Sequence, residues 1–173
     1  MSRPIDTVLP AFNFYVGFLE TGEELSLFDI AGLFIGGFSE VGGLDAGMAI
    51  ETITEGGVND RVYRLPGRTD VSNLTLTKGV GFTDDLWNWL EGWQKGEALR
   101  KSVFILLANS LKVPLKIWVA ENALPVKYSG PTLNAASSAL AIERLEIAPE
   151  KLTLILSTGD AIEGVTGALE GVF

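Results

Sequence analysis

The chain contains no cysteine and no histidine among its 173 residues. Without cysteine it has no disulfide bonds and no thiolate metal sites, and without histidine it lacks the commonest general base and the commonest transition-metal ligand. Basic residues are also few, because 13 Lys and Arg stand against 22 Asp and Glu and leave a net charge of −9. Binding of nucleic acid through its phosphates requires a high density of Lys and Arg, so this balance argues against such a function.

Long apolar segments are missing as well. The N-terminal residues 1–6 lack the apolar core of a secretory signal. The longest charge-free apolar run near them, residues 30–39, contains three glycines and is about half as long as a membrane helix. We therefore expect a chain that does not insert into a membrane and that is made and folded in a bacterial cytoplasm.

Charge is scarce and apolar surface is abundant. Charged residues make up 20% of the chain, and hydrophobic residues reach 47% before the 20 glycines are counted, whereas an average soluble domain reaches about 45–50% with its glycines. The length predicts one domain, residues 1–150, followed by a C-terminal extension, residues 151–173. The extension is a possible extra strand plus a tail from Ser157 that is either flexible or docked on a neighbour. We expect part of the apolar surface to lie between subunits; the alternative is a tightly packed, Gly-rich monomer.

Short alternating runs predict a mainly β fold. Phe12, Phe14, Val16 and Phe18 recur at period two, which indicates a strand with one apolar face. Further strands or extended segments are expected over residues 33–41, 48–53, 73–78, 103–107, 115–119, 123–131, 139–147 and 152–156. In residues 73–78, Leu74 and Leu76 should point inward and Asn73, Thr75 and Thr77 outward. The run over 103–107 is apolar on both faces, which predicts a central or helix-covered strand. This pattern favours a two-sheet β-sandwich or small barrel.

One short flanking α-helix is predicted before Gly96. Thr83 is suited to the N-cap position, and Asp84 and Asp85 place negative charge in the first turn. Apolar residues then recur at helical spacing, namely Leu86, Trp89, Leu90 and Trp93. We expect the three tryptophans of this segment to pack the helix on the sheet or to fill a subunit interface, with a sugar-stacking platform as the alternative: Trp87, Trp89 and Trp93.

The segment from Glu55 to Arg68 has no periodic pattern and is rich in Gly, Asn, Asp and Pro. A structureless stretch of this length is uncommon in a compact domain and usually indicates a functional loop or an arm. Glycine at positions 56 and 57 allows the chain to fold back, and three arginines provide cationic anchors for an acidic partner surface.

Catalytic, metal and phosphate sites are not predicted. Asp84 with Asp85, or Glu143 with Glu146, resemble the paired acids of glycoside hydrolysis, but the first pair is explained by the helix start and the second lies on a strand. Residues 59–60 lack the spaced carboxylates of a calcium loop. The glycines at 42–43 and 79–81 are not followed by Lys-Ser/Thr, so they are turn glycines.

Several motifs, in the same order along residues 12–147, resemble the tail-tube family of contractile phages and related contractile injection particles. They are the early Phe-rich strand, residues 38–44 (FSEVGGL), 55–57 (EGG), 65–67 (LPG), 73–80 (NLTLTKGV), 86–89 (LWNW), the strand ending at 107, Trp118, 122–131 (NALPVKYSGP) and 141–146 (AIERLE). The segment after Ile147 is longer than is usual in this family, and Leu124 occupies the place of an aromatic residue before Pro125.

The resemblance implies a two-sheet β-barrel of the tail-tube and type VI tube kind, with six copies in a ring and rings stacked into a hollow tube. It implies as partners other copies of the chain, the contractile sheath, baseplate and tail terminator proteins, and DNA or protein cargo held in the lumen without sequence-specific binding. It implies neither catalysis nor a cofactor, and it places the protein in a phage tail or in an injection particle released from the cell. Alternatives are a type VI secretion ring that carries effectors, a tube-initiating or adaptor paralogue at the baseplate, and a monomeric ligand-binding β-barrel.

Two further expectations follow from the resemblance. The arm should reach the next ring, with the contact made by Glu55, Gly56, Gly57, Arg61, Arg64, Leu65, Pro66, Gly67 and Arg68. If part of the net charge of −9 lines the bore, DNA can slide through it without adsorbing, because like charges repel. The alternative is that these carboxylates only keep the outer surface soluble.

Overall fold

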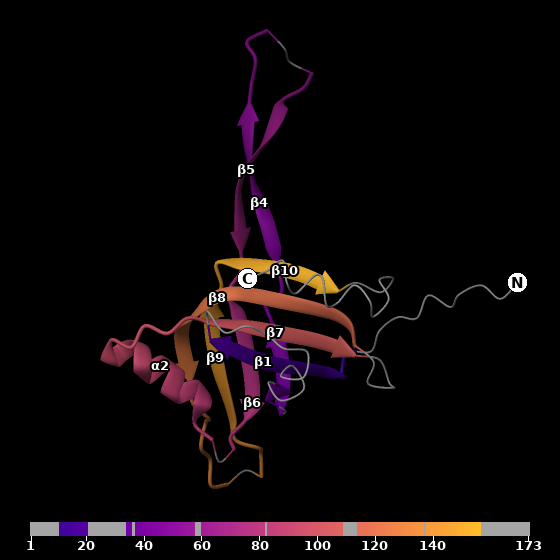
Figure 1. The fold of residues 1–173 in the computed structure, drawn as a ribbon. Coiled ribbons are helices and arrows are strands. Elements are labelled where there is room, and N and C mark those ends of the chain that lie inside the picture. The colour runs from indigo at the N-terminus through magenta and orange to yellow at the C-terminus, as the bar shows by residue number, and fades with distance from the viewer. Residues whose placement is uncertain are drawn as a thin grey trace, which may run out of the picture.

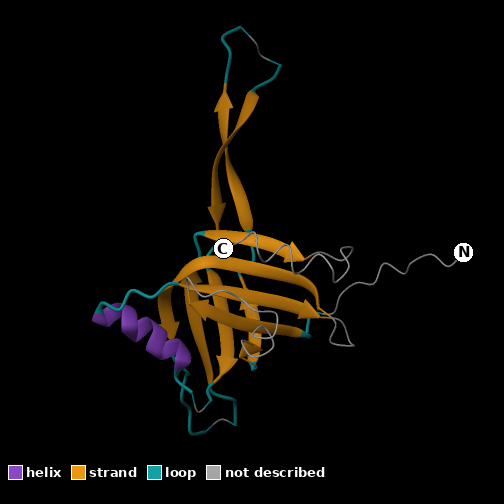
Figure 2. Ribbon diagram, viewed as in Figure 1, coloured by secondary structure: helices purple, strands orange, loops and turns teal. Residues whose placement is uncertain are grey.

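The structure is a computed structural model that describes residues 11–20, 34–35, 37–57, 60–81, 83–108, 114–136 and 138–156. These residues form a β-barrel with a helix on its side and a two-stranded hairpin that projects away from it (Figures 1 and 2). The mainly β fold with one short flanking helix is thereby confirmed. The C-terminal tail from 157 onward, which the sequence left either flexible or docked, lies outside the described residues.

One large sheet forms the barrel. Its strand order is β2-β1-β7-β8-β9-β6-β3, with β10 also paired to β8. The strands are β1 (Phe14–Glu20), β2 (Phe34–Ile35), β3 (Phe38–Gly42), β6 (Leu74–Gly79), β7 (Lys101–Ala108), β8 (Pro114–Ser129), β9 (Ile142–Ala148) and β10 (Lys151–Leu156). All their pairings are antiparallel.

Strand β8 connects the two halves of the barrel. Its first part pairs with β7 and β10, and its second part, from Leu124 onward, pairs with β9. Between the two parts, Asn122 has a positive φ of 50°, which Asn tolerates better than most residues. The sequence predicted two separate extended segments here, and the structure shows one strand of 16 residues with this irregularity inside it.

The barrel core follows the predicted alternation. In β7, Val103 and Ile105 point into the barrel, while Phe104 and Leu106 belong to a second apolar cluster on the other face. The strand lies between β1 and β8, as its apolar character on both faces predicted. Leu74 and Leu76 of β6 are also fully buried, together with Leu145 and Ile147 of β9 and Val16 of β1.

The prediction for Thr77 was wrong. It lies on the face of β6 opposite to Leu76, yet only 3% of the residue is exposed. Its cross-strand neighbours are Glu40 of β3 and Arg144 of β9. Because β6 is a central strand, side chains on both neighbours enclose this position, which the alternation of one strand alone cannot reveal.

Helix α2 (Asp85–Lys95) covers one side of the barrel. The predicted Thr83 cap was wrong, because Asp84 occupies the N-cap position and makes no capping hydrogen bond with its side chain. Gly96 ends the helix at a φ of 92°, and its backbone N–H points to the carbonyls of the last turn. Glycine adopts this left-handed conformation at no steric cost.

Gly43 fixes the connection between the barrel and the projecting hairpin. It has a φ of 83°, and a Cβ at this position would lie 2.1 Å from the carbonyl oxygen of Asn73. Immediately beyond it, Asp45 N–H donates to the Gly43 carbonyl at 2.7 Å, and Ser72 N–H donates to the Asp45 carbonyl at 3.1 Å. The two chain segments at the root of the hairpin are therefore held together by backbone contacts that require glycine.

We expect Gly43→Ala to destabilise the subunit by about 2–4 kcal/mol, because the new methyl group meets backbone atoms and the φ is unfavourable for alanine. Urea unfolding measures this cost. Gly42→Ala is the matched control, since a Cβ at Gly42 has no atom within 4 Å. Equal stability of the two variants would contradict the assignment.

Candidate assembly surfaces

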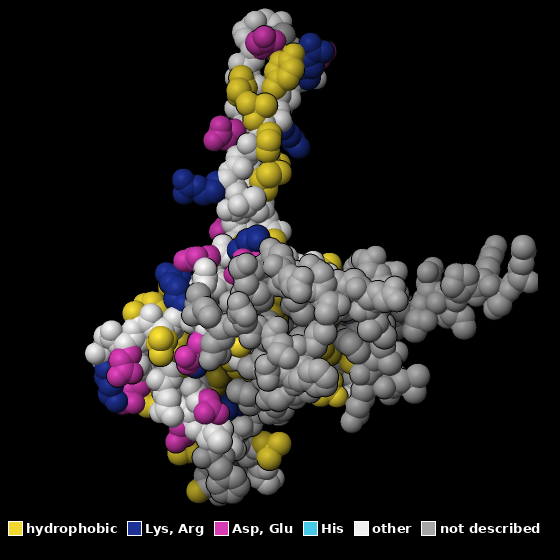
Figure 3. Space-filling view, in the orientation of Figure 1, with side chains coloured by type: hydrophobic (Ala, Val, Ile, Leu, Met, Phe, Trp, Pro, Cys, Tyr) yellow, Lys and Arg dark blue, Asp and Glu magenta, His cyan; other side chains and the backbone are white. Residues whose placement is uncertain are grey.

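The projecting hairpin consists of β4 (Ala46–Ile53) and β5 (Tyr63–Val71) and is called the arm below. Among the described strands these two pair only with each other, and every residue of β4 is exposed. Figure 1 shows the arm extending well beyond the barrel, and Figure 3 shows hydrophobic side chains along its length. A two-stranded hairpin is at best marginally stable by itself in water. The arm therefore has the properties of an element that is completed by a partner.

The predicted absence of structure between Glu55 and Arg68 was wrong in part. Residues 63–68 belong to β5, and residues 63–66 pair with residues 50–53 of β4. Of the described residues in this stretch, only 55–57 and 60–62 lie outside the strands. Cross-strand hydrogen bonds define β5, which is why its own composition did not identify it. The Pro66 that weakened the strand pattern is accommodated because the strand lies at an open sheet edge, where proline is tolerated.

An irregularity bends the arm near its middle. The register shifts between the pairs Met48–Thr69 and Ile50–Pro66, so that Ala49 faces both Gly67 and Arg68. A Cβ on Gly67 would lie 3.0 Å from the Ala49 carbonyl oxygen, so glycine allows the close approach of the two backbones. Such a bulge increases the local twist of a hairpin and re-aims its side chains.

Both faces of the arm carry exposed apolar side chains. Directly paired residues share a face, so Ile50 lies beside Pro66 on one face, and Ile53 lies beside Tyr63 on the other. Met48 shares the face of Ile50, and Leu65 shares that of Ile53. Apart from Pro66, the exposed fractions of these residues range from 43% for Tyr63 to 59% for Ile50. Because no described residue covers either face, the arm is suited to insertion between two surfaces.

Three arginines lie along the arm. Arg61 is close to Tyr63, with its Nη2 donating to the Tyr63 hydroxyl at 3.3 Å and its guanidinium 5.7 Å from the ring centroid. Arg64 and Arg68 are exposed. In the part of the chain that the structure describes, no carboxylate forms a salt bridge with either of them. Both arginines are thus available to a partner. At the tip of the arm, Gly57 lies in a turn with a φ of 91°.

The structure separates the three tryptophans of α2. Trp89 is buried and stacks edge-on against Phe18 of β1, at 5.8 Å between ring centroids. The Nε1 atoms of Trp89 and Trp93 both donate to the Leu99 carbonyl, at 2.9 and 2.8 Å. Trp87 is 43% exposed and lies edge-on to Tyr128, 5.3 Å away. Trp89 and Trp93 therefore hold the helix against the barrel, and Trp87 contacts Tyr128 of β8 while partly facing solvent.

A buried polar cluster, which the sequence did not reveal, lies at the end of the barrel. Lys78 Nζ is 3.3 Å from Glu143 Oε1, and only 7% and 6% of these side chains are exposed. The Tyr128 hydroxyl donates to Glu143 Oε2 at 2.7 Å. Burial, this hydrogen bond and the negative charges of Glu143 and Asp84 raise the pKa of Tyr128 to about 12, so the phenol remains a donor at neutral pH.

The imagined acid pair of Glu143 and Glu146 is not formed. The two residues are three apart on β9, so they point to opposite faces of the strand. Glu146 instead accepts a hydrogen bond from Asn73 Nδ2 at 2.8 Å. Glu143 is bound to its lysine and tyrosine, which gives it a structural role at the barrel end.

We expect Glu143→Gln to destabilise the subunit by about 3–5 kcal/mol, because it leaves the buried Lys78 ammonium without a counter-charge. The double variant Lys78→Met with Glu143→Leu removes both charges, and its stability should lie within about 1.5 kcal/mol of the parent. Urea unfolding of both variants provides the comparison. Equal losses in the single and the double variant would show that the charge pairing itself is unimportant.

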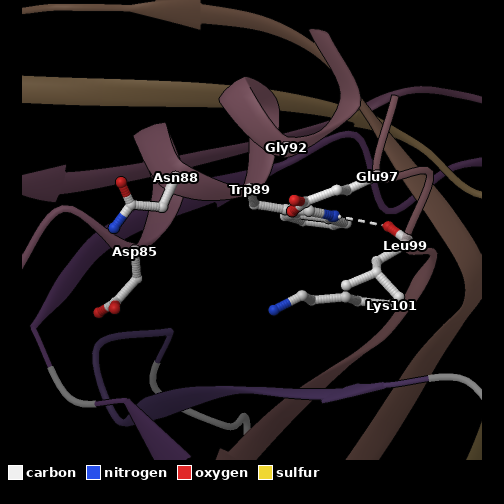
Figure 4. A pocket seen from close by; sticks show the side chains of 7 residues that line it. All are labelled: Asp85, Asn88, Trp89, Gly92, Glu97, Leu99 and Lys101. Carbon is white, nitrogen blue, oxygen red and sulfur yellow. Dashed lines mark hydrogen bonds between the residues drawn. The ribbon is translucent and has the colours of Figure 1, made fainter. Parts of the chain in front are cut away.

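A pocket of about 200 Å³ lies beside α2 and is lined by Asp85, Asn88, Trp89, Gly92, Glu97, Leu99 and Lys101 (Figure 4). Lys101 Nζ lies 5.8 Å from the centroid of the Trp89 ring and 3.6 Å from Glu20 Oε1. The lysine is thus already engaged by Trp89 of α2 and Glu20 of β1.

Within the described residues, no group of three Asp, Glu, His or Cys side chains could hold a metal ion. In the same residues, no helix is long and apolar enough to cross a bilayer.

Comparison with known proteins gives a consistent result. The family model described as T4-like virus tail tube protein gp19 matches residues 10–153. No curated protein sequence matches the chain. A chain of the extended sheath-tube complex of an extracellular contractile injection system, PVC, is 23% identical with a TM-score of 0.73, over 88% of this chain and 94% of that one.

Two further solved structures have the same fold. A chain of the baseplate of the anti-feeding prophage, 6-fold symmetrised, is 24% identical with a TM-score of 0.69, and the match covers 92% of this chain and all of that one. A type six secretion system protein is 17% identical with a TM-score of 0.56, over 83% of each chain. The family match spans most of the sequence, and the solved structures share the fold of this chain: this chain belongs to the T4-like virus tail tube protein family.

Proposed function

We propose that this protein is the structural subunit of the inner tube of a contractile phage tail or a related injection particle. Six copies form a ring, and rings stack around a channel for DNA or protein cargo. The observation that carries the proposal is the exposed arm, apolar on both faces, in a chain that belongs to a tail tube family. The protein acts as an assembly unit, without catalysis or a cofactor.

The open edges of the barrel sheet provide the joint within a ring. Among the described residues, β10 pairs only with β8, and β2 covers only Val16 and Gly17 of β1. These two edges lie at opposite ends of the run β2-β1-β7-β8-β10. Unpaired strand edges readily bind a strand of another chain. Pairing of one copy's β10 with the β1–β2 edge of the next is a head-to-tail contact, which closes into a ring when the rotation fits.

The arm provides the joint between rings. Its tip and second strand supply the contact residues Glu55, Gly56, Gly57, Arg61, Arg64, Leu65, Pro66, Gly67 and Arg68. Burial of the apolar faces in the next ring supplies the cover that the isolated arm lacks. Translation along one axis, repeated from ring to ring, generates an open-ended filament.

The remaining partners follow from the same assignment. The outside of the tube binds the sheath, and its two ends bind baseplate and tail terminator proteins. In the lumen, a subunit charge of −9 allows cargo to pass without sequence-specific binding. The tube is built in the host cytoplasm and leaves the cell as part of the particle.

A second candidate is a tube-initiating or adaptor subunit at the baseplate. The similar chain from the anti-feeding prophage baseplate, matched over its whole length, favours this candidate. Negative-stain electron microscopy of the purified protein separates the two. A tube subunit forms rings and long tubes, whereas an adaptor forms single or paired rings. Particles that remain single 18.5 kDa subunits at every concentration would overturn both.

A further inference from the structure

The barrel end opposite the arm carries its own exposed apolar surface. Leu133 and Leu140, in the connection between β8 and β9, are 83% and 87% exposed. Val80, just after β6, and Ile142, at the start of β9, are also exposed large hydrophobics. We call these four residues the apolar ledge. Single exposed leucines are common, but several exposed large hydrophobics at one end of a molecule indicate an interaction site.

The ledge is held in a defined position. Val80 N–H donates to the Ala141 carbonyl at 3.0 Å, and Gly79 is the cross-strand partner of Ile142. Immediately behind it, the buried Lys78–Glu143 pair joins the end of β6 to the start of β9. Val80 and Ile142 therefore rest on paired strands, and Leu133 and Leu140 belong to the connection between β8 and β9.

Arm and ledge lie at opposite ends of the same strand. The arm is attached just before Leu74, where β6 begins, and the ledge starts just after Gly79, where β6 ends. Figure 1 shows the arm pointing away from the barrel on one side and the β8–β9 connection leaving it on the other. Copies stacked in the same orientation would bring the arm of one against the ledge of the next.

The charges of the two surfaces are complementary. Asp84 and Asp85 are exposed at the start of α2, a few residues after Val80, and Asp84 is near enough to Tyr128 to affect its pKa. Tyr128 in turn binds Glu143, which is adjacent to Ile142 of the ledge. The apolar ledge is thus flanked by carboxylates, and the apolar face of the arm with Met48 and Ile50 is flanked by Arg64 and Arg68.

We propose that the apolar ledge of one copy is the receiving surface for the arm of a second copy in the adjacent ring. Ile50 and Met48 pack on Leu133 and Leu140, while the arginines of the arm pair with Asp84 and Asp85. This inference rests on the proposed function and adds the partner surface of the arm. Apolar burial supplies most of the affinity, and the charges fix the orientation.

Cysteine cross-linking tests the contact directly, because the native chain has no cysteine. The double variant Ile50→Cys with Leu140→Cys, oxidised after assembly, should give a ladder of disulfide-linked chains longer than dimers on a non-reducing gel. The matched control Ile50→Cys with Leu99→Cys places the second thiol at another exposed leucine, beside α2, and should give no ladder. Tubes that form normally without a ladder in the first variant would overturn the receiving surface and leave the tube function intact.

A second variant tests the ledge without cross-linking. Leu133→Asp with Leu140→Asp changes only exposed side chains, so the subunit should fold and form rings. Tubes longer than one ring should decrease at least about tenfold in micrographs, since a loss of ~1.4 kcal/mol per contact already gives this factor. Normal tube length would contradict the inference. Failure of the unaltered protein to form rings or tubes would instead contradict the proposed function.

Discussion

The double variant Arg64→Glu with Arg68→Glu is expected to form rings of normal mass and to lose long tubes. Both guanidinium groups are exposed on the arm and have no salt-bridge partner among the described residues. Reversal of their charge turns attraction to a carboxylate surface into repulsion at every subunit of a ring. Like-charge contacts in an interface cost several kcal/mol, and the six copies of the proposed ring multiply the effect.

Negative-stain microscopy measures tube length, and light scattering measures ring mass. The control is Lys95→Glu with Lys127→Glu, which makes the same change in net charge at two exposed sites outside the arm. It should form long tubes. Adding Asp84→Lys and Asp85→Lys to the arm variant restores opposite charges across the proposed contact and should recover part of the tube length. Long tubes in the arm variant itself would show that the arm does not join rings through these charges.

The elements whose sequence pattern reflects burial were predictable. β1 was identified from its alternating Phe and Val residues, and β7 from its apolar character on both faces. The helix was identified from the spacing of Leu86, Trp89 and Trp93. In each case the partner surface is the barrel core of the same chain, so the pattern and the packing agree.

The arm and the polar cluster were harder to predict for different reasons. β5 contains Pro66 and Gly67 and buries almost nothing within the subunit, so no hydrophobic period marks it. The burial of Lys78 depends on Glu143, which is 65 positions away in the sequence and directly opposite in the sheet. Neither residue alone distinguishes a buried ion pair from a solvent-exposed one. The length of the stretch without a pattern identified the arm as a region of interest, and only the strand pairing shows how it is built.

The second large effect is expected at β10, where proline substitutions separate folding from ring formation. Successive N–H groups of a strand point to opposite edges. Of Leu152 and Thr153, one therefore donates its N–H towards β8 and the other directs it to the open edge. Proline removes the N–H group in either case.

Leu152→Pro and Thr153→Pro should therefore fail in different ways. The variant that loses an N–H directed at β8 should unfold at a lower urea concentration, because its free energy of unfolding falls by about 3 kcal/mol or more. The other should keep its fold, because its N–H has no partner among the described residues of the subunit. Its particle mass should fall from that of the proposed six-membered ring to that of one subunit, since the strand of the next copy loses a hydrogen bond and meets the proline ring. Far-UV circular dichroism and light scattering distinguish the two results. If both variants form complete rings, the β10 edge is not the joint, and ring closure must use another surface of the barrel.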